Sequence, residues 1–174
     1  TADGHLDIFL NGGMADSVLP ALDFGYDHEI LPVHFDALGQ LAPEAPKFHL
    51  EHWIGTIAHW DAPVLRYPAE DAAREVRQQL EQGINFNLYM FHGGTNFGFY
   101  NGANHTADDP DDKIKNRYEP DITSYDYDAP LTEWGECTPK YFAIQKEMER
   151  YLGKTLPKPA RVPLQNIGAV QLNA

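Results

Sequence analysis

A glutamate at the end of an apolar stretch, followed closely by aromatic residues, is the first candidate for chemistry. Residues 47–51, KFHLE, have the composition of a short strand that ends in Glu51, and Trp53 and Trp60 follow it. Aromatic rings stack on the C–H face of a pyranose, and a carboxylate can meet an oxocarbenium-like carbon. The alternative is a plain solvated glutamate at a strand end, which position alone favours. The neighbouring rings point to a carbohydrate site.

Three tyrosines are further candidates for the same site. Tyr125 and Tyr127 alternate with two aspartates in residues 123–131, TSYDYDAPL, so an extended backbone would place both phenols on one face. Tyr89 lies within the apolar run of residues 84–91, INFNLYMF, and one face of that strand would look into a barrel. Tyrosine hydroxyls there could orient a carboxylate or bind sugar hydroxyls. The alternative is that these rings only cover the core.

Two other kinds of site can be weighed on spacing. His49, His52 and His59 could suggest a metal site, but a strand would send the first two, three residues apart, to opposite faces. Residues 93–98, GGTNFG, lack the Lys-Ser/Thr pair and the glycine spacing of a phosphate loop. We therefore expect neither a metal nor a phosphate site.

Strands and helices alternate along the chain. Acidic residues begin one helical segment and Gly83 ends it, while Thr138 caps another and Gly153 ends it. This order predicts an α/β fold with parallel βαβ units, in which the carboxyl ends of the strands carry the site. The expected elements are strands at 18–24, 47–51 and 84–91, helices at 28–41, 69–83 and 138–153, and a long loop at 92–130.

Composition excludes several classes of partner. The 174 residues include 13 basic and 26 acidic ones, for a formal charge of −13, which argues against nucleic acid and anionic membrane surfaces. No run approaches the roughly 18 apolar residues of a membrane span. Cys137 is the only cysteine, so no internal disulfide can form and no Cys-based metal site is possible. Nothing in the composition decides the compartment.

Several long motifs resemble the family-35 glycoside hydrolases, the β-galactosidase family. They are VLPALDFG, PKFHLEHWIG, NFNLYMFHGGTNFGFYNGAN and DITSYDYDAPLTEWGE with TPKYFAIQK, in the order of the family and covering most of residues 14–147. The resemblance implies a (β/α)₈ TIM barrel that hydrolyses terminal non-reducing β-D-galactosyl residues with retention. It implies a β-galactoside as substrate and no metal or organic cofactor.

The same resemblance assigns roles to five residues. Glu51 matches the nucleophile that forms a galactosyl-enzyme, and Trp53 matches an aromatic position beside it. Tyr89 matches a sugar-contacting tyrosine on the last barrel strand. Tyr125 and Tyr127 match a tyrosine pair that lines the galactose pocket.

The chain also departs from the family pattern. Thr56-Ile57-Ala58 stand where the family usually has Trp-Phe-Asp, which would remove a ring that contacts the sugar. Residues 105–120 form a longer acidic insertion than is usual. The family's acid/base lies in an Asn-Glu pair, and this chain contains none. Glu133 or Asp128 could stand in, but nothing in their sequence setting supports it.

We therefore expect residues 1–153 to be the sixth to eighth βα units of the barrel. Residues 154–174 are expected to be a Pro-rich linker towards a following β-domain. The missing N-terminal half of the barrel would then be the partner that supplies the acid/base, and the isolated chain would be inactive. The alternative is a non-catalytic galactoside-binding remnant or a fragment that complements the missing half.

Overall fold

The structure is a computed structural model that describes residues 17–25, 30–98, 100–106, 117–161 and 163–172. The charged run expected to be a solvated loop tip, residues 108–113, lies outside the described residues. So do the opening residues 1–16 and the first two residues of the helix expected at 28–41.

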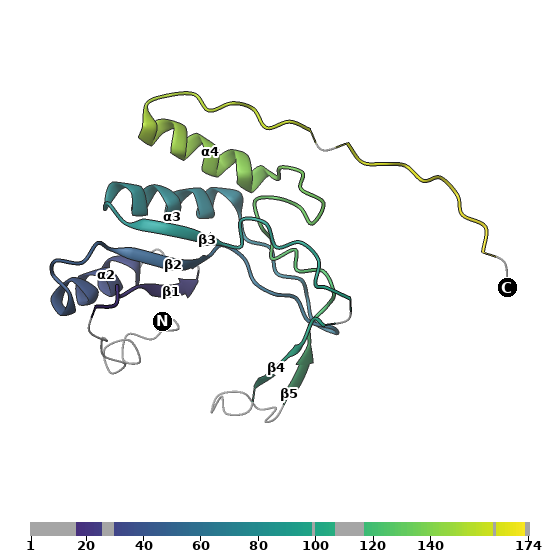
Figure 1. Cartoon of the computed structure of the whole chain (residues 1–174), viewed down its shortest axis with the longest axis horizontal. Helices are drawn as coiled ribbons and strands as arrows, with labels where there is room; N and C mark the ends of the chain where they lie inside the picture. Colours follow the sequence, from purple (N-terminus) through teal and green to yellow (C-terminus); the bar gives the residue numbers. More distant parts are fainter. Residues whose placement is uncertain (1–16, 26–29, 99, 107–116, 162, 173–174) are drawn as a thin grey trace.

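Three parallel strands form the central sheet. They are β1 (Leu22–Gly25), β2 (Phe48–Trp53) and β3 (Asn85–Tyr89), in the order β1-β2-β3. Helix α2 (Ile30–Leu41) lies between β1 and β2 in the chain, and α3 (Ala69–Glu81) lies between β2 and β3. The predicted α/β class is confirmed. The described strands form an open sheet and do not close into a barrel (Figure 1).

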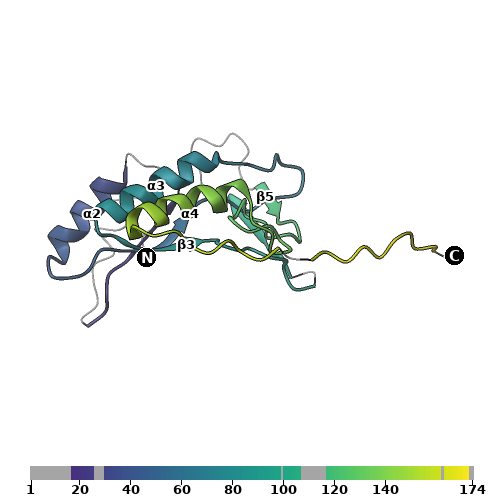
Figure 2. The ribbon, with the colours of Figure 1, turned by 90° about the horizontal axis from the view of Figure 1, so that it is seen from above.

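The helix ends follow the sequence rules. α3 has Glu70 and Asp71 in its first turn, where acidic side chains favour the helix dipole. α4 (Pro139–Leu152) begins after Thr138, whose hydroxyl accepts a hydrogen bond from the Tyr141 amide at 3.4 Å. It ends at Gly153 in the left-handed conformation, with φ of 63°. α4 packs along α3 (Figures 1 and 2).

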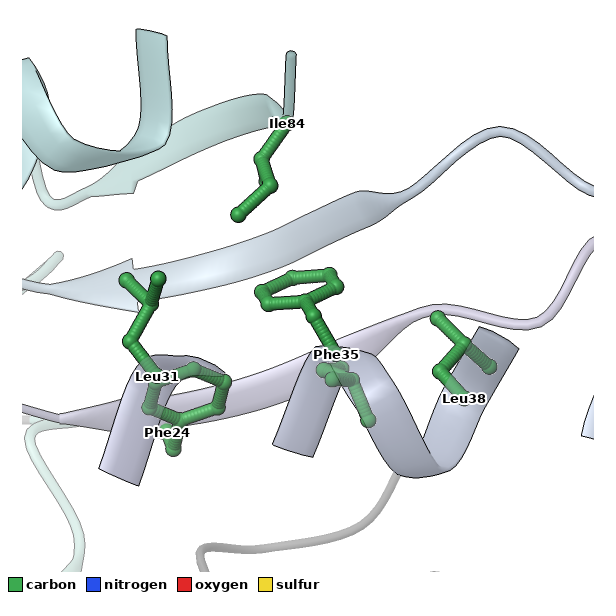
Figure 3. Close-up of a cluster of buried hydrophobic side chains, with 6 residues drawn as sticks. Phe24, Leu31, Phe35, Leu38 and Ile84 are labelled. Atoms are coloured by element: carbon green, nitrogen blue, oxygen red, sulfur yellow. The ribbon is translucent and has the colours of Figure 1, made fainter. Parts of the chain in front are cut away.

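Two apolar clusters hold the layers together. The first packs α2 against the sheet, and Figure 3 shows Leu31 and Phe35 of α2 pointing towards the strands. Its members are Leu22, Phe24, Leu31, Phe35, Leu38 and Ile84. The second packs α3 and α4 onto the residue that follows β2, and consists of Ile54, Ala72, Val76 and Ile144. The helices therefore cover one face of the sheet, and the other face carries the exposed side chains of Leu50 and Asn87.

The loop expected at 92–130 contains an antiparallel ribbon that the sequence did not predict. β4 (Ala103–Thr106) pairs with β5 (Arg117–Pro120). Neither segment has a long alternating apolar pattern, so periodicity gave no reason to expect strands. Residues 154–161 and 163–172, within the expected linker, contain neither helix nor strand.

The prediction that β2 separates His49 from His52 is wrong. The pairing register of β2 with β3 shifts between these two residues, and their ring centroids lie 4.9 Å apart. A bulge of this kind turns both histidines towards the helices. Among the described residues, no group of three or more His, Cys, Asp or Glu could hold a metal ion. In the same part of the chain, no helix is long and apolar enough to cross a membrane.

Candidate functional site

The strand β2 presents Glu51 and Trp53 together at its carboxyl end. The indole Nε1–H of Trp53 donates to Glu51 Oε2 at 3.0 Å, which fixes one oxygen of the carboxylate. The backbone N–H of Glu51 donates to Asp23 Oδ1 at 3.0 Å, so β1 also holds this point of the strand. A Cβ on Gly25 would lie 3.2 Å from Trp53 Cε3, so glycine leaves room for the indole ring.

The three tyrosines form one cluster at the end of β3. The hydroxyls of Tyr89 and Tyr125 lie 3.1 Å apart, within hydrogen-bonding distance. The ring centroids of Tyr89 and Tyr127 lie 5.4 Å apart, edge to face, and those of Tyr125 and Tyr127 also lie 5.4 Å apart. The backbone at Tyr127 is left-handed, with φ of 58°, so the extended segment assumed for residues 123–131 is not what brings the rings together.

Electrostatics links the tyrosine cluster to Glu51. Burial is the main cause that raises the pKa of Tyr125, and the hydrogen bond with Tyr89 and the Glu51 carboxylate raise it further. Burial, Tyr89 and Glu51 likewise raise the pKa of Tyr127. Both phenols therefore stay protonated and can donate hydrogen bonds at any physiological pH. The five residues singled out from the sequence thus lie in one constellation, and their roles in a reaction stay predictions.

Two glycines allow residues 123–131, the tyrosine segment, to lie directly on the ends of β2 and β3. A Cβ on Gly55 would fall 1.6 Å from the backbone oxygen of Tyr127, and one on Gly93 would fall 1.6 Å from that of Tyr125. The backbone N–H of Tyr125 donates to the Gly94 oxygen at 2.8 Å. The sequence analysis considered Gly93 only as part of an excluded phosphate loop, and it did not single out Gly55.

A buried lysine on α4 anchors the tyrosine segment from the helix side. Lys140 Nζ donates to the Ile54 oxygen, to the Asp128 oxygen and to Asp128 Oδ2, each at 2.7 Å. Asp128 Oδ2 also accepts the backbone N–H of Tyr67 at 2.7 Å. Burial lowers the pKa of Lys140, and its bond to Asp128 opposes that change. Sequence reasoning missed Lys140, because a lysine in the first turn of a helix normally lies in solvent.

A cavity of about 130 Å³ adjoins the cluster at Tyr127. Thr56 and Ala58, two of the three positions where the chain departs from the family pattern, form part of its wall. Arg66 lies on the same cavity and donates to Asp126 and, at 3.3 Å, to Asp128. The small residues after β2 therefore border a hollow that both apolar and charged side chains line.

The two carboxylates that could stand in for an acid/base are engaged in holding loops. Glu133 Oε2 accepts the Ser124 hydroxyl at 2.6 Å, and its Oε1 accepts the Thr95 hydroxyl. Asp128 binds Lys140 as described above. These contacts give both residues a structural task.

Comparisons with known proteins agree with the motifs. The model of Glycosyl hydrolases family 35 matches residues 1–151. A beta-galactosidase of Felis catus is 37% identical over 180 residues, covering 98% of this chain and 25% of the relative. A beta-galactosidase of Xanthomonas manihotis is 38% identical over 173 residues, covering 99% and 27%. Beta-galactosidase-1-like protein 2 of Homo sapiens is 37% identical over 150 residues, covering 86% and 22%.

The chain therefore spans about a quarter of the length of these relatives. The family match covers β1 to β3, the ribbon and nearly all of α4, and includes every residue of the constellation. The chain belongs to family 35 of the glycosyl hydrolases.

Proposed function

We propose that residues 1–153 are the last three βα units of the (β/α)₈ barrel of a retaining β-galactosidase. Three parallel strands with intervening helices on one face, and the family match, support this placement. The constellation lies at the carboxyl ends of β2 and β3, which is the edge where barrel enzymes carry their sites. Residues 154–174 would lead from the barrel towards a following β-domain.

Glu51 is the proposed nucleophile. The indole of Trp53 holds Oε2, so Oε1 is the oxygen that attacks the anomeric carbon and forms the galactosyl-enzyme. As the leaving group departs, positive charge develops on the sugar ring beside the carboxylate. Tyr125 and Tyr127 supply protonated hydroxyls, and Tyr89 orients Tyr125. The rings also provide the apolar surface on which a galactose C–H face would stack.

The acid/base is proposed to lie in the N-terminal half of the barrel. A retaining enzyme needs a second carboxyl group about 5–5.5 Å from the nucleophile. General acid catalysis typically contributes about 10²- to 10⁴-fold, so the 174-residue chain alone would show no measurable turnover. The substrate would be a galactoside of an oligosaccharide or glycoconjugate.

The observation that carries this proposal is the hydrogen bond from Trp53 to Glu51, whose carboxylate also raises the pKa of Tyr125 and of Tyr127 in the tyrosine cluster. The test is covalent trapping with a 2-deoxy-2-fluoro-β-galactoside that carries a good leaving group, on the protein with its upstream sequence. We expect mass spectrometry to find the label on Glu51, and Glu51→Gln to abolish both labelling and turnover. Glu44→Gln, at an exposed position, is the matched control.

Three outcomes would contradict parts of the proposal. A label on another carboxylate would remove Glu51 as nucleophile. Turnover by the 174-residue chain that disappears with Glu51→Gln would place the acid/base within this chain. Galactoside binding without labelling or turnover by the longer protein would favour the alternative of a non-catalytic binding module.

A further inference from the structure

Four buried polar side chains form a continuous chain on the helix side of β2. His49 Nε2 lies 3.2 Å from the Phe24 oxygen, and His49 Nδ1 lies 2.9 Å from Gln79 Oε1. Gln79 Nε2 lies 2.9 Å from His52 Nδ1, and His52 Nε2 lies 2.7 Å from Glu75 Oε2. Each of the four side chains belongs to a residue at most 2% exposed.

The hydrogens available to this chain can be counted. Four links run from the Phe24 oxygen to the Glu75 carboxyl, and each link needs one hydrogen. Neutral His49 and His52 supply one hydrogen each, and the Gln79 amide supplies one, because its oxygen faces the other histidine. Three hydrogens serve four links, so a fourth proton is required if every link is a hydrogen bond.

Burial places that proton outside the imidazoles. It lowers the pKa of His49 to about 3, with further lowering by the neighbouring His52 and by His34 of α2. Burial also lowers the pKa of His52 to about 3. The other neighbours in ring contact are uncharged, namely Phe24 of β1 and Phe35 of α2 with His49, and Phe86 of β3 with His52. Both histidines are therefore neutral near pH 7, so all four links can be hydrogen bonds only if Glu75 carries the fourth proton.

A neutral Glu75 completes all four bonds. Its O–H donates to His52 Nε2, His52 Nδ1–H donates to the Gln79 oxygen, the Gln79 amide donates to His49 Nδ1, and His49 Nε2–H donates to the Phe24 oxygen. This direction requires the amide oxygen and nitrogen of Gln79 to exchange places, a half-turn that preserves the shape of the side chain.

The backbone of β2 links this hydrogen-bonded chain of side chains to Glu51. His49 and His52 reach the same face only because β2 bulges between them, and the bulge turns Leu50 and Glu51 towards the other face. We propose that the chain His49–Gln79–His52–Glu75, with Glu75 protonated at its end, is a positioning device that holds the bulge and thereby aims Glu51. The positioning role rests on the proposed function of Glu51, whereas the proton inventory does not.

Nitrogen NMR of the histidine side chains tests the inventory without any assay of activity. We expect the Nε2–H tautomer for His49 and the Nδ1–H tautomer for His52, both neutral at pH 7, with His49→Gln and His52→Gln used to assign the signals. The opposite tautomers would overturn the inventory, because they leave the link from His49 to the Phe24 oxygen without a hydrogen and need no proton on Glu75. An imidazolium at either residue would overturn it as well.

Kinetics of the protein with its upstream sequence tests the positioning role. Glu75→Leu replaces the carboxyl with an apolar group of similar size and removes the hydrogen bond to His52. It should lower kcat on the order of 10- to 100-fold, since small misplacements of a reacting group have such effects. Glu75→Gln should restore kcat, because its amide donates as the protonated carboxyl does. Leu38→Ala, in the apolar cluster under α2, controls for lost stability and should leave kcat unchanged.

The outcomes separate the two proposals. If Glu75→Leu and Glu75→Gln have the same kcat, the chain is only packing and the positioning role is wrong. If the unaltered protein shows no galactosidase activity, the proposed function fails while the tautomers still decide the proton inventory.

Discussion

The two halves of the candidate site are built in different ways. Glu51, Trp53 and Tyr89 sit on β2 and β3, where the parallel ladder fixes the backbone. Tyr125 and Tyr127 sit on an irregular segment, where left-handed residues and close contacts fix it. The first half depends on a regular ladder of backbone bonds, whereas the second depends on isolated backbone bonds and on a few side-chain and glycine contacts. Mutations outside the constellation should therefore disturb the loop half far more than the strand half.

Lys140→Met should give the largest effect. It removes one ammonium group that binds the Ile54 oxygen, the Asp128 oxygen and the Asp128 carboxylate, and so joins the end of β2 to the tyrosine segment. Removing one member of a buried ion pair typically costs about 3–5 kcal/mol, and Tyr67 and Arg66 retain some contact with Asp128. We expect a loss of about 3 kcal/mol in the free energy of unfolding, measured by denaturant titration.

Lys146→Met is the matched control for this variant. Lys146 is an exposed lysine of the same helix, so its loss should change stability by less than about 0.5 kcal/mol. Equal stability of the two variants would mean that Lys140 does not anchor the tyrosine segment.

Gly55→Ala should have the next largest effect. Its Cβ would fall 1.6 Å from the Tyr127 oxygen, a backbone atom that cannot move aside as a flexible side chain would. Overpacking typically costs about 1–3 kcal/mol, and here the displacement is passed to the Tyr127 ring. Denaturant unfolding and the aromatic proton shifts of Tyr127 would measure both consequences.

Gly39→Ala tests whether the effect comes from the contact or from the glycine itself. Gly39 lies in α2, and a Cβ there meets no atom within 4 Å. An alanine in a helix is about 0.5–1 kcal/mol better than a glycine, so this variant should be slightly more stable. If Gly55→Ala also gained stability, the close approach of the tyrosine segment to β2 would be refuted.

The contrast between regular elements and irregular segments also explains which features of the structure the sequence predicted. Strands β1 to β3 and helices α2 to α4 were predicted because their periodicity, caps and terminal glycines act locally. Glu51 and Trp53 were found because they follow a recognisable strand. The bulge in β2 depends on the buried side-chain partners of His49 and His52, which come from α3. The ribbon of β4 and β5 and the three bonds of Lys140 also join distant segments, and no local pattern encodes them.

Arg66→Ala should have the smallest effect, although Arg66 binds the same loop as Lys140. Its guanidinium donates to Asp126 and Asp128, but its side chain is 57% exposed, whereas that of Lys140 is 4% exposed. Exposed ion pairs contribute about 0.2–1 kcal/mol, and added salt screens them. We expect a loss in that range at low ionic strength that shrinks further in about 1 M salt, again by denaturant unfolding. A salt-independent loss as large as that of Lys140→Met would mean that the tyrosine segment is held from the solvent side, and the distinction between a buried and an exposed anchor would no longer stand.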